Sequence, residues 1–495
     1  MRENLPYDDT DPYSIFNYAL DLVGYNFKDV LVSNIDDEEL LYEKIEYYNN
    51  PRGKGSLGNL LEKYYFYYEP NSNPAPDFEK AGTELKVTPY EKTKTGKKKA
   101  GERLVITMIP YDRPISDNFM ESHLFTKIRL ILFIFYFRNR ELDRTEYPIN
   151  YISLFNILDP TLKEDLKIIE DDYQKITRKI MDGRAHELSE GDTQYLGACT
   201  KGATAKSSIK KQYYSDIPAK RRAFSLKQSY MTYVFNNYIL KNPKVNQAIF
   251  SDKDLENSDF ETEILKKLEL SYNKAEKDLY KEYHVNKSKN SNNVLVMRML
   301  GVKTDNAEEF EKANIQIKTI RVRKNGKLRE HMSFSNFNIL EFVEEEFEDS
   351  TIYKLFSETK FLFIVFQENK NGDYCLRGAK FWNMPIADLE GQAHKEWKMY
   401  QDKFKSKINF IVKESDDNVV VYNDLPKARY TEILHIRPHA TNTAYVIDGV
   451  KYGKGTEKDM DILPSGDKMT KQSFWLNKDY IYNQIYELLE IEGNN

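Results

Sequence analysis

One short motif occurs twice in this chain, separated by nearly half of its 495 residues. Residues 76–86 read PDFEKAGTELK, and residues 308–318 read EEFEKANIQIK. Three further segments recur in the same order: 126–134 with 359–366, 224–230 with 474–480 and, more weakly, 199–204 with 437–442. Self-similarity in a constant order indicates duplication of one folding unit. The sequence therefore predicts two related domains, 1–243 and 258–495, joined by a linker over 244–257.

The two copies of the motif differ in chemistry. In the first copy, Asp77, Glu84 and Lys86 form a carboxylate–carboxylate–lysine set. In the second copy the matching positions hold Glu309, Gln316 and Lys318. A glutamine cannot offer a divalent cation the negative charge that a glutamate supplies. The sequence therefore predicts one intact site and one altered site.

The intact set suits phosphodiester hydrolysis. Glu84 and Lys86 are two residues apart in a predicted strand, so their side chains share one face, and Asp77 lies at the strand's entrance. Hydrolysis needs an activated water, charge neutralisation on the phosphate and help for the leaving oxygen, which divalent metals held by carboxylates supply. We therefore expect Asp77, Glu84 and the Leu85 carbonyl to bind Mg²⁺. The competing interpretation is an exposed strand carrying a surface Glu–Lys ion pair.

Two roles stay open at this stage. Lys86 could orient or deprotonate the attacking water, or it could stabilise the pentavalent phosphorus. Glu62, on a predicted helix over 56–68, could add a carboxylate to the metal site. The corresponding region of the second copy, residues 287–304, has no acidic residue. Two carboxylates are thus lost together there, which favours lost catalysis in the second half.

The residue pattern predicts a mixed α/β protein. Helical spacing covers 13–24, 56–68, 160–182, 226–240 and 259–283, and strands are predicted at 84–88, 104–109 and 130–137, with a second sheet from about 315. The strand at 130–137 is apolar almost throughout and is therefore expected at the centre of its sheet. Each half is expected to form a mixed central sheet flanked by helices.

Composition limits partners and location. The net charge is −5, so nucleic-acid binding requires basic residues gathered on one face. Lysine and arginine clusters occur at 92–99, 206–211 and 220–222, although each alone suits a solvated loop. Cys199 and Cys375 are the only cysteines, which predicts a reducing compartment and hence the cytoplasm. The longest apolar run is too short to cross a membrane, and the sequence has no nucleotide-binding motif.

Three segments together resemble a known family. KGSLGNLLE, PDFEKAGTELK and SHLFTKIRLILFI, spaced as they are here, resemble the MutH family of the PD-(D/E)xK nuclease superfamily. That family contains a mismatch-repair nicking enzyme and two-copy type II restriction endonucleases that cut at GATC. GRAHELSEGDTQYLGACTKGATA and YSDIPAKRRAFSLKQSYMT resemble the two-copy subgroup. The resemblance implies two tandem restriction-endonuclease-like domains and Mg²⁺-dependent cleavage of double-stranded DNA at GATC.

The resemblance also assigns residues. It implies catalytic roles for Glu62, Asp77, Glu84 and Lys86, a catalytic or DNA-contacting role for Lys127, and DNA contacts for Lys54, Lys201 and Lys227. The competing interpretation of Lys127 is a surface lysine that precedes a buried strand. At Cys199 the chain departs from the single-copy pattern, which has arginine before proline there, whereas the second half has that pair as Arg437 and Pro438. Individual base contacts are therefore not assigned.

The second half is hypothesised to bind DNA without cutting it, as a non-catalytic effector. The residues that would form its basic and aromatic surface are Arg437, His439, Lys471, Trp475 and Lys478. One live site per chain cannot cut both strands at once, so either two chains associate on DNA or one chain acts on each strand in turn. Holding a second GATC site could promote the pairing.

Other functions and other residues compete with this interpretation. A strand-specific nicking enzyme of mismatch repair and a non-catalytic DNA-binding regulator are the alternatives. The duplication favours a restriction endonuclease over the nicking enzyme, and the intact first-copy site favours either enzyme over the regulator. His186 and Glu187 suggest an acid–base pair, but a structural loop is the favoured interpretation. His435 and His439 have helical metal-pair spacing, yet Pro438 argues against a helix there. His439 is instead expected to contact a DNA phosphate.

Overall fold

The computed structural model describes residues 5–50, 56–71, 73–201, 208–251, 253–415 and 418–490. The chain divides into two compact units, the first made of 1–260 with 307–314 and the second of 261–306 with 315–495. Residues 244–257, the predicted linker, fall within the first unit, and so does a short segment from the middle of the second half. No helix in the described ranges is long and apolar enough to span a membrane.

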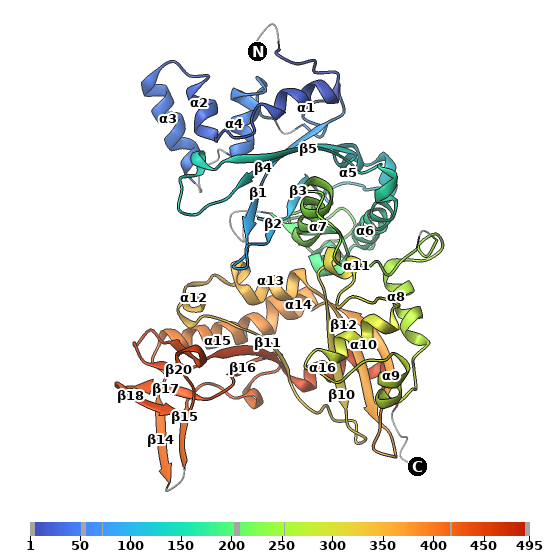
Figure 1. Ribbon diagram of the computed structural model, residues 1–495, viewed down its shortest axis with the longest axis vertical. Coiled ribbons are helices and arrows are strands. Elements are labelled where there is room, and N and C mark those ends of the chain that lie inside the picture. Colours follow the sequence, from blue (N-terminus) through green and yellow to red (C-terminus); the bar gives the residue numbers. More distant parts are fainter. Residues whose placement is uncertain are drawn as a thin grey trace. The chain divides into compact units, whose positions relative to one another are not determined.

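A four-stranded mixed sheet forms the centre of the first unit (Figure 1). Its order is β2-β1-β4-β5, with bounds β1 Glu84–Lys92, β2 Lys98–Ala100, β4 Leu130–Phe137 and β5 Ile149–Asn156. β1 runs parallel to β4, with Glu84 opposite Ile131, and the other pairs are antiparallel. The apolar β4 is buried along nearly its whole length, so the predicted central strand is confirmed.

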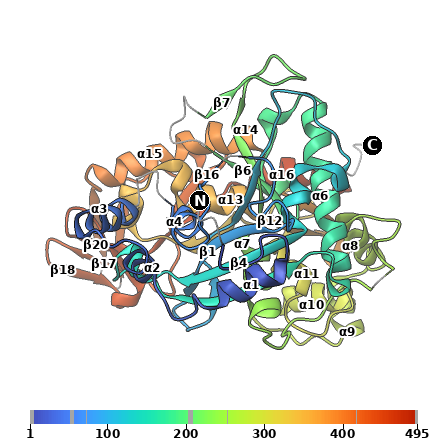
Figure 2. The same ribbon diagram turned by 90° about the horizontal axis from the view of Figure 1, so that it is seen from above.

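Helices cover both faces of this sheet (Figures 1 and 2). One face packs against the amino-terminal helices α1 Pro12–Leu20, α2 Phe27–Val32, α3 Glu38–Asn49 and α4 Leu57–Tyr64. The predicted cap of α4 is present, because the Ser56 hydroxyl accepts the Asn59 N–H at 3.1 Å. The other face meets α7 Gln228–Tyr233 and its π-helical continuation Val234–Ile239, where the Phe235 ring lies 4.6 Å from that of Phe135.

A second, antiparallel sheet completes the first unit. Its order is β3-β9-β6, with bounds β3 Leu104–Met108, β9 Arg222–Leu226 and β6 Leu196–Thr200. Around it lie α5 His123–Ile128, the long α6 Lys163–Met181, and a small hairpin of β7 Ile209–Lys210 and β8 Ala219–Lys220. The helix α11 Glu308–Ala313 also belongs to this unit and packs on α7.

The second unit has counterparts of both sheets, although its mixed sheet has no strand in the described residues that matches β2. Its mixed sheet has the order β10-β12-β13, with β10 parallel to β12 and β13 antiparallel. Its antiparallel sheet has the order β11-β21-β16. The bounds are β10 Ile315–Val322, β11 Met332–Asn336, β12 Lys360–Glu368, β13 Tyr374–Trp382, β16 Leu434–Pro438 and β21 Gln472–Leu476. Strand order and direction thus correspond between the units, as expected for a duplicated domain.

The remaining elements of the second unit surround these sheets. The helices are α8 Phe260–Glu269, α9 Glu276–Glu282, α10 Ser291–Met299, α12 Ile339–Glu344, α13 Thr351–Glu358, α14 Ile386–Asp388, α15 His394–Lys405 and α16 Lys478–Ile485. The added strands are β14 Phe410–Ser415, β15 Asn418–Asn423, β17 Ala444–Ile447, β18 Val450–Gly453, β19 Met460–Ile462 and β20 Lys468–Thr470. The helix predicted over 259–283 is therefore two helices, α8 and α9, separated by a turn.

Both units contain a buried carboxylate that accepts consecutive main-chain N–H groups. Asp172 of α6 accepts the main-chain N–H groups of Gln194, Tyr195 and Leu196 at 2.7–2.9 Å. In the second unit, Glu396 of α15 accepts the corresponding N–H groups: Glu432, Ile433 and Leu434. These hydrogen bonds fix the start of β6 and of β16, the strands that lead into the predicted DNA-binding segments. Nothing in the short sequence echoes predicted this match.

Candidate active site

The predicted acidic set comes together at the entrance of β1. Glu84 is the first residue of the strand and is only 1% exposed. Lys86 lies on the same face and its Nζ donates to Glu84 Oε1 at 2.6 Å. Asp77 Oδ2 accepts the Leu85 N–H at 3.0 Å, so a single hydrogen bond holds that carboxylate beside the strand's first residues. The buried Glu84 is incompatible with a merely exposed ion pair.

The turn between Asp77 and Glu84 requires Gly82. Gly82 has a φ of +63°, in the left-handed region that side-chain-bearing residues disfavour. A Cβ there would meet the guanidinium of Arg129. The matching residue of the second copy, Asn314, also has a positive φ, +53°, and asparagine tolerates this conformation better than most residues. The backbone turn is thus kept in both copies even though the site chemistry is not.

Lys127 joins the site from α5. Its Nζ donates to both carboxylate oxygens of Glu84, at 2.9 and 3.1 Å, and its side chain is 9% exposed. Lys127 is therefore not a surface lysine, and β1–β4 pairing brings it to Glu84 from 43 residues away. Two ammonium groups hold one buried carboxylate, which keeps Glu84 in a fixed position.

The carboxylates of this site influence one another. Burial, and then the charge of Asp77, raise the pKa of Glu62 to about 7. Burial, and then the charge of Glu84, raise the pKa of Asp77 above its ordinary value. Both shifts arise because negative groups gather where water solvates them poorly. A cation placed among them would relieve this repulsion.

The donor set suits a hard divalent cation. Asp77, Glu84 and the Leu85 carbonyl offer only oxygen ligands, which Mg²⁺ and similar ions prefer. The described parts of the chain contain no group of three or more His, Cys, Asp or Glu side chains already converged on one metal position, so ligands would include water and the main chain. A further polar atom fits this account: the Tyr68 hydroxyl is buried and has no hydrogen-bond partner among the described residues.

Tyr68 was missed by sequence reasoning. The charges of Asp77 and Glu62 both act on its hydroxyl, whose pKa burial raises well above the ordinary value. Its ring packs on Phe78 at 5.5 Å between centroids. An unpaired donor beside carboxylates is placed to bond a water in the coordination sphere of a cation. Tyr68 stands in a run of tyrosines, so no local signal could have singled it out.

The other predicted DNA contacts have different surroundings. Lys54 lies outside the described residues, and Lys201 is half-buried just after β6. Lys227 is buried and its Nζ donates to the Thr193 carbonyl. In the second unit the side chain of Asn477, at the matching position, donates to the carbonyl of Thr431. Lys227 thus has a structural contact, and its contact with DNA stays a prediction.

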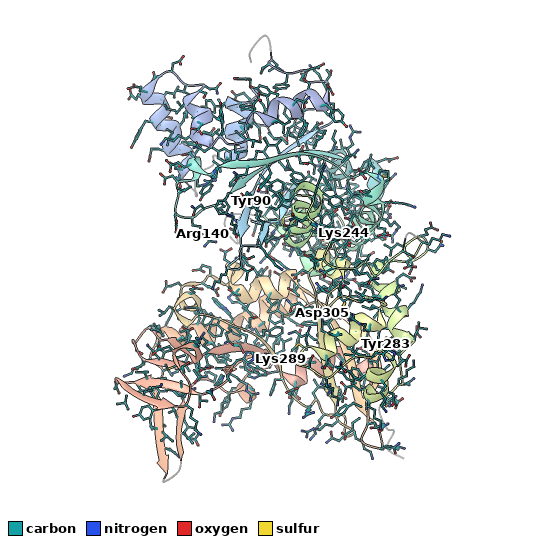
Figure 3. All side chains as sticks on the ribbon, viewed as in Figure 1. Tyr90, Arg140, Lys244, Tyr283, Lys289 and Asp305 are labelled. Atoms are coloured by element: carbon teal, nitrogen blue, oxygen red, sulfur yellow. The ribbon has the colours of Figure 1, made fainter. Side chains whose placement is uncertain are left out.

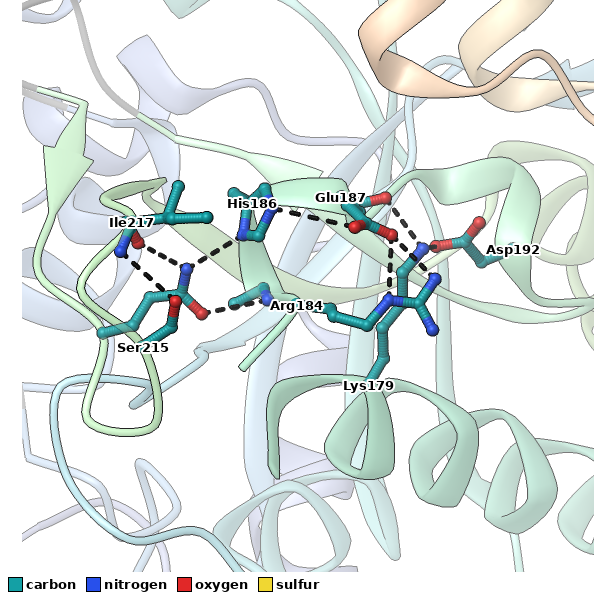
Figure 4. Close-up of polar contacts among 9 residues, drawn as sticks. Lys179, Arg184, His186, Glu187, Asp192, Ser215 and Ile217 are labelled. Atoms are coloured by element: carbon teal, nitrogen blue, oxygen red, sulfur yellow. Dashed lines mark hydrogen bonds and ion pairs between the residues drawn. The ribbon is translucent and has the colours of Figure 1, made fainter. Parts of the chain in front are cut away.

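His186 and Glu187 belong to a structural loop (Figure 4). Gln212 bonds His186 Nδ1 at 3.2 Å and also the main chain of Ala185 and Ile217. Glu187 accepts two hydrogen bonds from the Arg184 guanidinium. His186 Nε2 also lies 3.7 Å from Glu187 Oε1, and together these contacts hold both residues within the loop.

The altered motif of the second copy is divided between the two units. Glu309, which matches Asp77, lies on α11 in the first unit and accepts the N–H groups of Ile249 and Phe250 at 2.9–3.1 Å. Gln316 and Lys318 lie on β10 in the second unit.

Two lysines near the altered motif also have new partners. Lys360, which matches Lys127, is buried and pairs with Glu261. Beside Glu309, Lys244 (labelled in Figure 3) pairs with Glu308 at 3.2 Å.

Two of the predicted basic residues of the second unit, Arg437 and His439, lie near Trp475. The guanidinium of Arg437 lies 5.0 Å from the Trp475 ring centre, and the ring of His439 lies 5.6 Å from it. Arg437 and His439 are exposed. His435 is buried in strand β16 and bonds Asn477, so it does not form a helical metal pair with His439.

Two carboxylates and two lysines lie together where β1 enters the central mixed sheet. This arrangement defines a nuclease of the restriction-endonuclease-like fold. The family profile described as DNA mismatch repair enzyme MutH matches residues 66–172, which include Asp77, Glu84, Lys86 and Lys127. Over 467 residues the chain is 33% identical to the Type II restriction enzyme Sau3AI of Staphylococcus aureus, covering 88% of this chain and 94% of that protein. The chain belongs to this family of MutH-like type II restriction endonucleases, site-specific deoxyribonucleases that act on DNA and generally use a divalent metal.

Proposed function

We propose that this restriction endonuclease cleaves both strands of DNA at GATC with Mg²⁺ as its cofactor, and that its second unit binds DNA without cutting it. One observation carries the proposal. Asp77, Glu84, Lys86 and Lys127 lie together in the first unit, whereas their counterparts have other partners. The GATC specificity rests on the resemblance to the two-copy subgroup.

The residues of the proposed site in the first unit have different roles. Asp77, Glu84 and the Leu85 carbonyl would hold Mg²⁺, with Glu62 nearby as a further carboxylate. The bound cation neutralises phosphate charge and lowers the pKa of a coordinated water. Lys127 bonds both oxygens of Glu84 and is the more buried lysine, so we assign it to positioning Glu84.

Lys86 is the lysine that can reach the substrate. Its side chain is 19% exposed, against 9% for Lys127, and it bonds one oxygen of Glu84. An ammonium carries three donors, so Lys86 keeps others for the attacking water or a phosphate oxygen. We therefore assign the catalytic role to Lys86.

The second unit lacks what cleavage needs. Glu309 is occupied by two main-chain N–H groups, Gln316 carries no charge, and Lys360 is paired with Glu261. The exposed Arg437 and His439 beside Trp475 instead suit phosphate and base contacts. We infer a non-catalytic effector that holds a second GATC site, so that two chains can associate on DNA and cut both strands.

The domain division and location complete the proposal. We place the catalytic domain at 1–243 and the effector at 258–495, on the basis of the repeated segments. Both cysteines are free and buried, in keeping with a cytoplasmic enzyme.

Plasmid cleavage tests the proposal. Unmethylated plasmid with Mg²⁺ should give linear fragments whose sequenced ends fall at GATC, and EDTA should prevent cleavage. Open circles would support a strand-specific nicking enzyme, and intact plasmid a DNA-binding regulator. The Asp77→Ala variant should be inactive, and full digestion by it would refute the proposed site.

A second variant tests the altered copy. Glu84→Gln combined with Gln316→Glu should also stay inactive, because restoring one carboxylate does not free Glu309. Vigorous cleavage by this double variant would show that the second copy can be catalytic.

A further inference from the structure

Lys318 of the altered copy is a half-buried lysine without a carboxylate partner in the described structure. Its Nζ reaches only the Ser333 carbonyl at 3.4 Å and the face of the Phe334 ring, 4.8 Å away. Burial lowers the pKa of its ammonium, and no acidic group opposes that shift. Lys86, at the matching position, has Glu84 at 2.6 Å. With Gln316 in place of that glutamate, no carboxylate among the described residues neutralises this ammonium.

A cavity of about 260 Å³ lies beside Lys318, within the second unit. Its wall runs along β10 and β11 and includes Trp475 of β21. Three of its lining residues are basic, namely Lys318, Arg321 and His331, and Glu330 is its one acidic lining residue. Arg321 pairs with Glu276, so Lys318 is the lining cation that has no carboxylate partner among the described residues.

One residue that lines the cavity carries an unused donor. Trp475 Nε1 is buried and has no acceptor within the described ranges. His331 Nδ1 accepts the Lys478 N–H at 3.1 Å, so the neutral ring carries its proton on Nε2 and offers a further donor. An indole N–H, an imidazole N–H and an ammonium are all donors, and their natural complement is an anion with several oxygen acceptors.

We propose that this cavity binds a backbone phosphate of duplex DNA, with Lys318 taking the place that a divalent cation has in the first unit. The loss of the carboxylate removes the metal ligand and exposes the ammonium to the phosphate in a single change. Trp475 connects the cavity to the exposed Arg437 and His439, so the same duplex can contact all of them. Binding at this site needs no metal. The inference rests on the proposed DNA-binding role of the second unit and specifies its mechanism.

Metal-free DNA binding by the full chain tests the inference. In EDTA the carboxylates of the first site repel phosphate, so fluorescence anisotropy of a labelled GATC duplex reports mainly on the second unit. We expect Lys318→Met to raise the Kd about tenfold and to reduce the slope of log K against log salt by about one. The matched control is Lys324→Met, which removes the same charge from an exposed turn and should leave the slope nearly unchanged.

The variant should remain folded, because it removes a half-buried charge that lacks a carboxylate partner. Its melting temperature should equal or exceed that of the wild type. Thermal unfolding with inorganic phosphate tests whether the cavity binds free phosphate or the phosphate of a duplex. It should raise the melting temperature of the wild type only weakly, while the duplex raises it strongly. Strong stabilisation by free phosphate with no effect of Lys318→Met on duplex binding would overturn the assignment to DNA.

The Arg437→Gln variant separates this inference from the proposed function. If Arg437→Gln weakens duplex binding but Lys318→Met behaves like Lys324→Met, the phosphate cavity is refuted and the DNA-binding role stands. If neither Arg437→Gln nor Lys318→Met changes the Kd, both the cavity and the DNA-binding role of the second unit fail.

Discussion

Replacing Glu62 by glutamine should stabilise the metal-free protein while impairing its chemistry. The pKa of Glu62 rises from 4.5 to about 7 because of burial and then of the charge on Asp77. This difference corresponds to about 3 kcal/mol, which partial exposure to solvent reduces to about 2 kcal/mol. At pH 8 the carboxylate is ionised and the folded state bears that cost. A neutral amide of the same shape does not.

The sign of the pH dependence follows from the raised pKa. The folded protein holds the Glu62 proton more tightly than the unfolded chain does, so this contribution to stability is complete below pH 4.5. It is lost as the pH rises from 4.5 to about 7. The Glu62→Gln variant should lack this loss, and its first thermal transition at pH 8 should be about 5 °C higher than that of the wild type.

The assay is thermal unfolding in EDTA across this pH range, for the wild type and Glu62→Gln. Added Mg²⁺ should reverse the order, because the carboxylate then gains a cation and the wild type is stabilised more. An unchanged pH slope in the variant, or a lower melting temperature at pH 8 without metal, would refute the electrostatic account of the site.

Three further predictions test the local structure. Tyr68→Phe should weaken Mg²⁺ affinity about tenfold in calorimetric titrations. The control Tyr7→Phe, which loses a hydrogen bond to the Phe66 carbonyl, should leave that affinity unchanged, and equal effects of the two variants would exclude a role for Tyr68. Gly82→Ala should destabilise the protein by about 1–2 kcal/mol in urea unfolding, because its φ is positive; Gly82→Asn should cost less, as Asn314 adopts the same conformation, and an equally large loss would contradict this. Lys312→Met should cost about 3–5 kcal/mol, because it leaves Asp165 buried without its 2.6 Å ion pair; a loss within error of zero would show that the second-copy helix does not stabilise the first unit.

The sequence by itself determined the local parts of this protein. Alternation at two-residue spacing places Glu84 and Lys86 on one face of a strand wherever that strand lies, and an apolar run such as 130–137 must be buried. The duplication and the loss of charge at Gln316 are also evident from the amino-acid sequence. Glu62 was an open candidate from its place on a predicted helix, and family resemblance gave it a catalytic role. Lys127 was assigned through the resemblance alone, since no spacing connects residues so far apart.

Tertiary structure decided which partners the charged side chains have. The parallel pairing of β1 with β4 brings Lys127 to Glu84. Folding also places the buried Lys227 ammonium where it donates to a main-chain carbonyl. Glu309 looks like a usable carboxylate in the sequence, yet main-chain N–H groups occupy it. A residue's type and its neighbours in the chain set its charge and its face, but contacts between distant segments decide whether that charge is neutralised, and in Lys318 it is not.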